Sequence, residues 1–254
     1  MYKYETHLHT AEASACAVSY GMEYPEYYKA MGYSGIFVTD HFFNGHTCIP
    51  DNLSWEKRVN EFCKGYEHAK EIGDKIGLSV FFGWEANFEG DEFLIYGLDK
   101  DWLLNHPDIL SWSRTRQYDM IHSSGGLVVQ AHPFRERDYL SAVRLNPDTV
   151  DAWEAYNAFN EPYQNYNAQI YCREHDIFMT AGSDIHKTGS LPEGSHFGME
   201  FNHQLKSPAD YVKAILNREG EPVVPEKSRL SSVRSSELSK IHTSLPIIIN
   251  HREN

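Results

Sequence analysis

The stretch GIFVTDH at residues 35–41 joins an apolar segment to two polar residues. Residues 35–39 are short, apolar and contain β-branched and aromatic side chains, which predicts a buried strand. Asp40 and His41 follow where that strand ends. Because other apolar runs in the chain also end in a histidine or a carboxylate, the pattern indicates a fold that gathers polar side chains at its strand ends.

Strand-like and helix-like segments alternate along most of the chain. The predicted strands are residues 2–8, 35–39, 78–84, 92–98, 126–131, 150–154, 177–181 and 197–201. The predicted helices are residues 24–31, 55–73, 109–123, 161–175 and 208–217. Such alternation is typical of parallel βαβ units in a barrel or a doubly wound sheet, and about seven strands in the repeat is near the number in a closed barrel.

Length and charge limit the classes of function. The 254 residues, 41% of them hydrophobic, suffice for one large α/β domain with a buried core. The net charge of −13 argues against binding of long nucleic acids, which normally needs a basic face. A local basic side chain or a bound metal ion can still attract a single phosphate group.

The texture of the sequence changes near residue 220. We expect residues 1–220 to form one domain and residues 221–254 to form a tail that is loosely structured or docked on the barrel. Pro222 interrupts the helical pattern there, and residues 228–239 are polar and rich in serine. Residues 245–249 are apolar enough to dock on the rest of the molecule.

The cysteines and the absence of long apolar runs bear on location. The four cysteines form no C-x-x-C pair, so we expect reduced thiols and a cytoplasmic protein rather than a disulfide framework; they are Cys16, Cys48, Cys63 and Cys172. The first residues lack the apolar core of a signal peptide, and no run of about 18 apolar residues predicts a membrane span. The sequence does not indicate an oligomeric state.

Histidines and carboxylates follow five of the predicted strands. In parallel barrels the carboxyl ends of the strands face the active site, so we expect these side chains to converge. Imidazole and carboxylate ligands together suit Zn, Mn or Fe. Side chains that are two residues apart on a strand point the same way, so His7 and His9 are placed to hold one ion. The residues are His7, His9, Asp40, His41, Glu85, His132, Asp184 and His186.

Each of these residues also has a purely structural interpretation. An isolated H-x-H pair is a weak motif. Asp40 could cap a helix or form a turn, and Glu85 could be a buried acid that accepts hydrogen bonds. The shared position of the residues at strand ends favours the metal site, because independent structural roles would not all fall at the same kind of place.

The motifs resemble those of the PHP (polymerase and histidinol phosphatase) superfamily. They are HLHT at 7–10, TDH at 39–41, GWE at 83–85, AHPF at 131–134 and GSDIH at 182–186, in the order of the family. The resemblance implies a distorted (β/α)7 barrel and two or three divalent metal ions (Zn, Mn or Fe). It implies ligands at His7, His9, His41, Glu85, His132, Asp184 and His186. Asp40 would then orient a ligand or shape a turn.

The chain departs from the family pattern in two places. Many relatives place a histidine in the segment that matches residues 92–97, where Phe93 stands in this chain. Many also place an Asp or His five or six residues beyond the H-x-H pair, in the stretch 11–16. Glu12 is a candidate ligand there, although it is equally well explained as a solvated loop acid, and Cys16 is a weaker candidate.

The expected reaction is hydrolysis of a small phosphate ester by a metal-activated hydroxide. His7, His9, Glu85 and Asp184 would hold the ions that activate it, and His41 and His186 the ion nearest the phosphate. Among the residues beyond the ligands, Arg135 follows His132 on one loop and could make bidentate contacts to phosphate, or pair with Glu136 or Asp138 on the surface. Asp184, His186 and Arg135 are the predicted catalytic residues, with Arg116 and Lys187 as fainter phosphate-binding candidates.

The substrate is less constrained than the site. A phosphomonoester such as histidinol phosphate or a nucleotide fits the resemblance. The sequence shows no polymerase domain and no basic channel that would indicate a long nucleic acid as substrate. Two alternatives stay open: a metal-dependent amidohydrolase, whose family also uses H-x-H on its first strand, and a metal-binding module whose active site has decayed.

Overall fold

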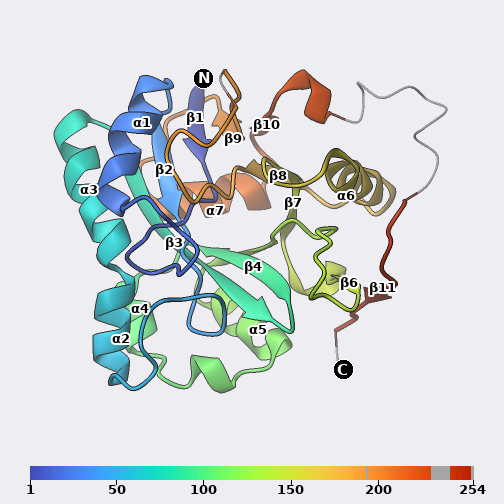
Figure 1. Ribbon diagram of the computed structural model, residues 1–254, viewed down its shortest axis with the longest axis horizontal. Helices are drawn as coiled ribbons and strands as arrows, with labels where there is room; N and C mark the ends of the chain where they lie inside the picture. Colours follow the sequence, from blue (N-terminus) through green and yellow to red (C-terminus); the bar gives the residue numbers. More distant parts are fainter. Residues whose placement is uncertain (193, 230–240, 253–254) are drawn as a thin grey trace.

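The computed structural model describes residues 1–192, 194–229 and 241–252. Its main sheet has the strand order β10-β9-β1-β2-β3-β4-β5-β7-β8, and a small second sheet pairs β6 with β11 (Figure 1). The strands are β1 (Tyr2–Glu5), β2 (Gly35–Val38), β3 (Ser79–Phe88), β4 (Asp91–Tyr96), β5 (Leu127–Gln130), β6 (Val143–Leu145), β7 (Ala152–Asn157), β8 (Met179–Gly182), β9 (Gly198–Phe201), β10 (Glu221–Val223) and β11 (Ile247–Ile249).

The main sheet curls into a nearly closed barrel. The gap between β1 and β8 is bridged just beyond the ends of both strands, where Leu8 pairs in parallel with Ile185. The amide of His9 donates to the carbonyl of Ile185 at 2.9 Å, and the amide of Asp184 donates to the carbonyl of His7 at 2.8 Å. The predicted α/β barrel is therefore confirmed.

Two strands differ from the predicted parallel alternation. β4 runs antiparallel to both β3 and β5, and β9 runs antiparallel to β1. The β3–β4 connection is a two-residue turn in which Glu89 has φ 55° and Gly90 has φ 96°. Positive φ at both central residues gives the tight hairpin turn that matches strand twist, so no helix is needed between these strands.

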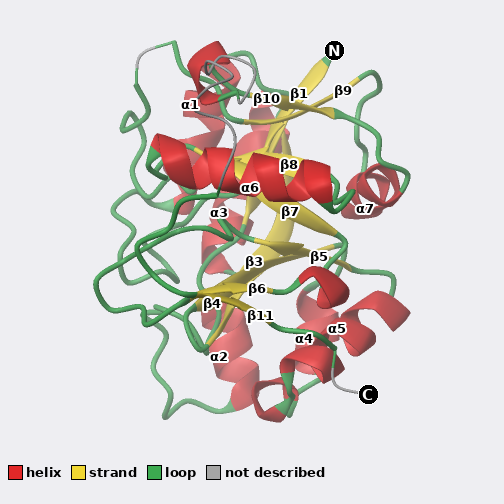
Figure 2. Cartoon of the chain, turned by 90° about the vertical axis from the view of Figure 1, so that its right-hand side faces the viewer, coloured by secondary structure: helices red, strands yellow, loops and turns green. Residues whose placement is uncertain are grey.

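Helices surround the barrel (Figure 2). The segment 55–73, predicted as one helix, is two helices that meet at Cys63. The second of these helices packs closely on the loop that follows β1, since a Cβ on Gly65 would lie 2.0 Å from Oγ1 of Thr10. The helices are α1 (Tyr24–Ala30), α2 (Trp55–Phe62), α3 (Lys64–Ile76), α4 (Lys100–Leu104), α5 (Arg114–Ser123), α6 (Pro162–Glu174) and α7 (Pro208–Leu216). Among the described residues, none of the helices combines the length and apolarity that crossing a bilayer requires.

Alternation along β4 decides which side chains enter the barrel. Leu94 and Tyr96 belong to the buried cluster inside it, while Phe93 and Ile95 pack in a second cluster on the outside. Side chains two residues apart on a strand share a face. Glu92 therefore lies on the inner face, at the end of β4 that borders the mouth of the barrel.

The connection between β5 and β7, residues 131–151, contains no α-helix. β6 lies in this connection and pairs in parallel with β11 near the end of the chain, with Val143 opposite Ile247. Parts of the segment 221–254 thus pack on the barrel, since β10 also pairs with β9. Residues 230–240, which hold most of the serine-rich part of the expected tail, lie outside the described residues.

Candidate metal centre

Two short segments of the same pattern build the floor of the site. In His7-Leu8-His9 and Asp184-Ile185-His186, an apolar residue separates two polar ones. Leu8 and Ile185 are fully buried in one apolar cluster and pair with each other. Because the flanking residues of an extended segment point the opposite way, this pairing turns the polar side chains of both segments towards the barrel mouth.

All seven side chains implied as ligands by the resemblance meet at this mouth. The Nε2 atoms of His7 and His9 lie 3.1 Å apart. Among the described residues, candidate ligand atoms lie within 4.8 Å of one another in each of four overlapping groups. The groups are His7, His9 and Asp184; His7, Glu85 and His132; His9, His41 and His186; and His41, Glu85 and Glu92.

Glu85 lies at the centre of the cluster and spans it. Its Oε1 is 3.2 Å from Nε2 of His7 and 3.2 Å from Nε2 of His132. Its Oε2 is 2.8 Å from Nδ1 of His41 and 3.5 Å from Nε2 of His9. Each carboxylate oxygen therefore faces a different pair of histidines, as a ligand shared by two ions would.

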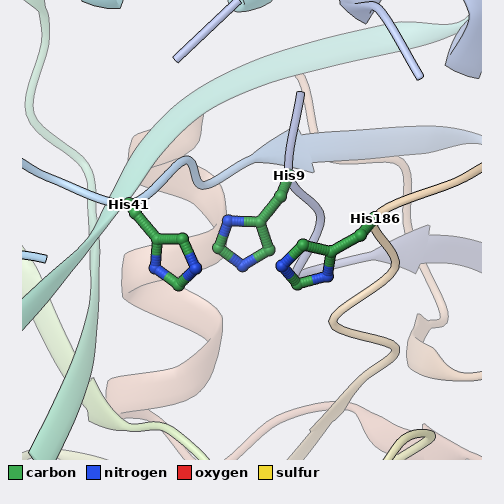
Figure 3. Close-up of side chains that lie close together, drawn as sticks. All are labelled: His9, His41 and His186. Atoms are coloured by element: carbon green, nitrogen blue, oxygen red, sulfur yellow. The ribbon is translucent and has the colours of Figure 1, made fainter. Parts of the chain in front are cut away.

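The three histidines at the outer side of the cluster point towards one another from different segments (Figure 3). The ring centroids of His9 and His41 are 4.2 Å apart, and those of His9 and His186 are 4.3 Å apart. Three imidazoles packed this closely cannot all carry a positive charge at low cost. Burial, together with His41 and His186, holds the pKa of His9 well below its usual value, which favours the neutral form that binds metal ions.

Two of the candidate ligands sit in backbone conformations that L-residues rarely adopt. Asp184 has φ 60° and His132 has φ 29°. Such conformations cost of order 1–3 kcal/mol each and persist where the surrounding structure fixes them. Each residue lies two positions beyond the end of a strand, β5 or β8, and the strained backbone there aims its side chain into the cluster.

The carboxylates of the cluster are held in their ionised form. Burial alone would raise the pKa of Glu85, but His7 and His41 keep it well below its usual range. Burial likewise opposes ionisation of Asp184, while Arg135 and His7 keep its pKa well below the usual range. Ionised carboxylates beside imidazoles form a donor set that suits divalent transition metals.

Two buried atoms support a metal site directly. Nδ1 of His41 and Oε2 of Glu85 are shielded from solvent and lie 2.8 Å apart, yet neither has a hydrogen-bond partner in acceptable geometry. Buried polar atoms are almost always satisfied, so orphaned ones call for a specific explanation such as an ion. The residues present therefore fit divalent cations, held among the seven clustered side chains.

A second layer of polar residues orients the ligands. Oε1 of Glu154 lies 2.9 Å from Nδ1 of His7, and its Oε2 accepts a hydrogen bond from the amide of His132. The hydroxyl of Ser14 lies 3.1 Å from Nδ1 of His9 and donates to Asp40. Asp40 accepts hydrogen bonds from Thr10 and Ser14. Glu154 had no signal in the sequence beyond its place on a strand.

Glu92 lies in the cluster. The family resemblance had instead aligned Phe93 with the position where many relatives carry a histidine. Oε2 of Glu92 is 3.5 Å from Nε2 of His132, and its Oε1 is 3.8 Å from Nδ1 of His41. Phe93 is buried on the outer face of β4. Burial, and then the charge of Glu85, raise the pKa of Glu92. β4 therefore directs the carboxylate of Glu92 into the cluster, one residue before the position where the family resemblance led us to look for a histidine.

The structure does not bring Glu12 into the cluster. Its carboxylate accepts a hydrogen bond from the amide of Gly21 and lies 2.9 Å from Nδ1 of His68, on the surface. Cys16, from the same loop, lies beside His41 and His186 instead. Burial opposes ionisation of this thiol, but the two histidines lower its pKa to about 5.

Arg135 reaches the cluster from the loop after β5. Its Nη1 is 2.6 Å from Oδ2 of Asp184. Its Nε donates to Asn160 and its Nη2 to Asn157, so the guanidinium is fixed on two sides. Arg116, by contrast, pairs with Asp108 on the surface, away from the site.

A cavity of about 300 Å³ opens beside the cluster. Three basic side chains and one aromatic ring line it next to two of the candidate ligands. This volume is typical of a small-molecule site, and the lining is mostly basic. Its lining residues are Arg135, Arg137, Phe159, Asp184, His186, Lys187 and Ser190.

Comparison by sequence finds no relative: no family profile matches the chain, and no curated protein does. Comparison by structure does. A two-domain protein from Bacteroides vulgatus ATCC 8482, which contains a predicted PHP-like metal-dependent phosphoesterase, has a TM-score of 0.64 at 16% identity. The match covers 87% of this chain and 64% of that protein, so this chain spans less than two thirds of its length.

Two further structures share the fold over most of their length. A protein from Bifidobacterium adolescentis ATCC 15703, described as a candidate metal-dependent phosphoesterase, has a TM-score of 0.50 at 18% identity, with 86% of this chain and 96% of that one covered. An amidohydrolase from Chromobacterium violaceum, with bound sulfate and no metal, has a TM-score of 0.51 at 12% identity, with coverage of 84% and 96%. At these identities the likeness establishes the fold alone, which the PHP-like phosphoesterase and the amidohydrolase both share with this chain.

Proposed function

We propose that this chain is a metal-dependent phosphoesterase that hydrolyses a small phosphate ester. The observation that carries the proposal is the contact between Arg135 and Asp184 at the wall of the cavity. A partly exposed guanidinium, of a type suited to bidentate binding of phosphate, thus lies next to a cluster suited to divalent ions. The PHP-like phosphoesterase from Bacteroides vulgatus, which shares the fold, adds support.

The candidate ligands divide into overlapping sets around Glu85. Three of these sets are His7, His9 and Asp184; His7, Glu85 and His132; and His9, His41 and His186. Because His7 and His9 each direct one ring nitrogen at the cluster, each would serve an ion in only one of its two sets. We infer two or three ions, of Zn, Mn or Fe, from this arrangement. When bound, such ions supply an acidified water and neutralise charge on the phosphate.

The side chains of the chain itself have separate tasks. Arg135, held by Asn157 and Asn160, would bind and orient the phosphate oxygens. Glu154 fixes the ring of His7 through Nδ1, which leaves Nε2 directed at the cluster. Phe159 and Lys187 line the outer part of the cavity, where the organic part of the ester would lie. A phosphomonoester such as histidinol phosphate or a nucleotide is of a suitable size.

Metal analysis combined with an assay of phosphate monoesters tests the proposal. The wild-type protein should contain divalent metal and hydrolyse p-nitrophenyl phosphate when Mn or Zn is supplied. The variants His9→Ala and Asp184→Ala should lose both metal and activity. Full activity in either variant would disprove the site, and a metal-loaded wild type without activity would favour a metal-binding module.

An amidohydrolase is the second candidate, because the Chromobacterium violaceum protein of that description shares the fold. Side-by-side assays of phosphate esters and amides separate the two. Strong amide turnover without phosphatase activity would replace the first proposal.

All four thiols are free in the structure, which agrees with a protein of a reducing compartment such as the cytoplasm.

A further inference from the structure

The loop that carries Arg135 lacks the covering helix that follows most strands of the barrel. Residues 242–252, which we name the C-terminal strap, run alongside this connection instead (Figure 1). The strap and the loop are far apart in sequence. The contacts between them begin at Glu136, the residue next to Arg135.

Glu136 is the main attachment point at the start of the strap. Its Oε2 accepts hydrogen bonds from the amide of Ser244 at 2.9 Å and from the amide of Leu245 at 3.2 Å. The hydroxyl of Ser244 donates to the same oxygen. On the other side, the hydroxyl of Tyr163 on α6 donates to Oε1 at 3.3 Å. One carboxylate thus ties the loop to the strap and to a helix.

Further along, the strap follows the loop through a backbone ladder. The amide of Val143 donates to the carbonyl of Pro246 at 2.9 Å, and β6 then pairs with β11. The amide of Asn250 donates to the carbonyl of Leu145 at 2.8 Å. The connection is therefore held at both ends, near Arg135 and again at β6.

The attachment at Glu136 bears on Arg135 because the two residues are neighbours in a tight turn. The amide of Arg135 donates to the carbonyl of His132, a candidate metal ligand, at 2.9 Å. A turn fixed on one side by His132 and on the other by Glu136 restricts the backbone of Arg135. Fixing a binding group in advance reduces the entropy lost when substrate binds, and small displacements of such groups are costly.

We propose that Glu136 is a positioning residue, through which the C-terminal strap holds Arg135 in place to bind phosphate. This inference rests on the proposed phosphoesterase function. Glu136 itself lines neither the cavity nor the ligand cluster, so any effect on phosphate binding passes through its neighbours in the cavity wall, Arg135 and Arg137. The strap would then govern affinity for phosphate rather than the capacity to hold metal ions.

Hydrogen exchange and phosphate binding in full-length variants test the inference. In Glu136→Ala, amides of residues 135–145 and 243–250 should exchange faster together, at unchanged metal content. The Kd for inorganic phosphate and the KM for p-nitrophenyl phosphate should rise about tenfold, with kcat little changed, since misplacing a binding group by ~1 Å can cost up to about 100-fold. Glu136→Gln, which keeps an acceptor oxygen, should restore part of the affinity. The exposed Glu71 of α3 offers a matched control, Glu71→Gln, that should behave as wild type.

Two results would overturn the inference alone. One is unchanged exchange of residues 135–145 in Glu136→Ala. The other is faster exchange with unchanged Kd and KM for phosphate compounds. If the metal-loaded wild type neither binds phosphate nor hydrolyses any phosphate ester, the proposed function fails and takes this inference with it, so the two failures are distinguishable.

Discussion

Nη1 of Arg135 lies 2.6 Å from Oδ2 of Asp184, so the one guanidinium in the cavity wall that touches the ligand cluster pairs with a candidate metal ligand. Replacing Arg135 with alanine would remove the charge-assisted contacts to phosphate that we propose for it. We expect kcat/KM for phosphate esters to fall about 10- to 100-fold, since hydrogen bonds to charged groups contribute about 1.5–3 kcal/mol.

Arg135→Lys should recover only part of this loss, because a lysine cannot keep the forked contacts to Asn157 and Asn160. Steady-state kinetics and metal analysis of both variants provide the measurement. Loss of bound metal from Arg135→Ala would show that the guanidinium supports the ligand cluster rather than the substrate.

Glu92 and Glu12 make a matched pair for metal binding. Glu92→Gln should weaken binding of one ion about tenfold or more, because its carboxylate faces His41 and His132. Glu12→Gln should leave metal content unchanged, because the Glu12 carboxylate is engaged by Gly21 and His68. Calorimetric titration with metal ions distinguishes the two variants. A greater loss of metal affinity in Glu12→Gln than in Glu92→Gln would contradict the placement of Glu92.

Glu154 offers a test of ligand orientation. Its carboxylate fixes Nδ1 of His7 and also accepts from the amides of His132 and of the Asn157 side chain. Glu154→Gln can no longer serve all of these donors as an anion, so we expect metal affinity or activity to fall about 10- to 100-fold. Competition with a chelator measures the affinity. An unchanged dissociation constant would show that the His7 ring is oriented by packing alone.

Gly182 tests how tightly the backbone approaches the site. A Cβ added there would lie 2.4 Å from Oε1 of Glu154 and 2.6 Å from Cβ of His7. Gly182→Ala should therefore lower both thermal stability and metal content, with a loss of about 1–3 kcal/mol typical of overpacking. In Gly45→Ala the nearest atom would be 3.4 Å away, so this variant should resemble wild type. Thermal unfolding of a metal-loaded Gly182→Ala protein at the wild-type temperature would refute the clash.

Asp151 should make stability depend on pH. Burial raises the pKa of this carboxyl above its usual 3.8, although the Val128 amide and His122 act in the other direction. The folded protein then holds this proton more tightly than the unfolded chain. The associated stabilisation is present at low pH and is lost as the pH rises above 3.8 towards the raised folded-state pKa.

Asp151→Asn, which resembles the protonated acid, should reduce this loss of unfolding free energy with rising pH. Denaturant titrations from about pH 4 towards neutrality measure it. A variant whose stability falls with pH as steeply as that of wild type would show that Asp151 does not contribute.

The sequence predicted the barrel and the convergence of its ligands because both depend on local patterns. Apolar runs mark the strands, and polar residues at their ends identify the mouth. The position on β4 was harder to predict, because both faces of that strand are buried: Leu94 faces the barrel and Phe93 the outside. With no polar face to set the phase, alternation cannot decide between Glu92 and Phe93, and a shift of one residue exchanges the two faces.

Other features depend on contacts between distant segments. The β6–β11 pair consists of two three-residue strands whose pairing is set by tertiary packing. Glu12 lies in a loop, where no periodicity fixes the direction of a side chain. The antiparallel course of β4 had a local signal in the Glu89-Gly90 turn, but its meaning depends on recognising the flanking segments as paired strands.

The position of β1 between β2 and β9 has a consequence for biosynthesis. A ribosome releases His7 and His9 long before Asp184 and His186, and β1 keeps an unpaired edge until β9 has been made. Contacts between distant parts of a chain form slowly, and open strand edges favour aggregation. The complete set of candidate ligands exists only once most of the barrel has been translated, so the nascent chain must protect β1 without help from that cluster.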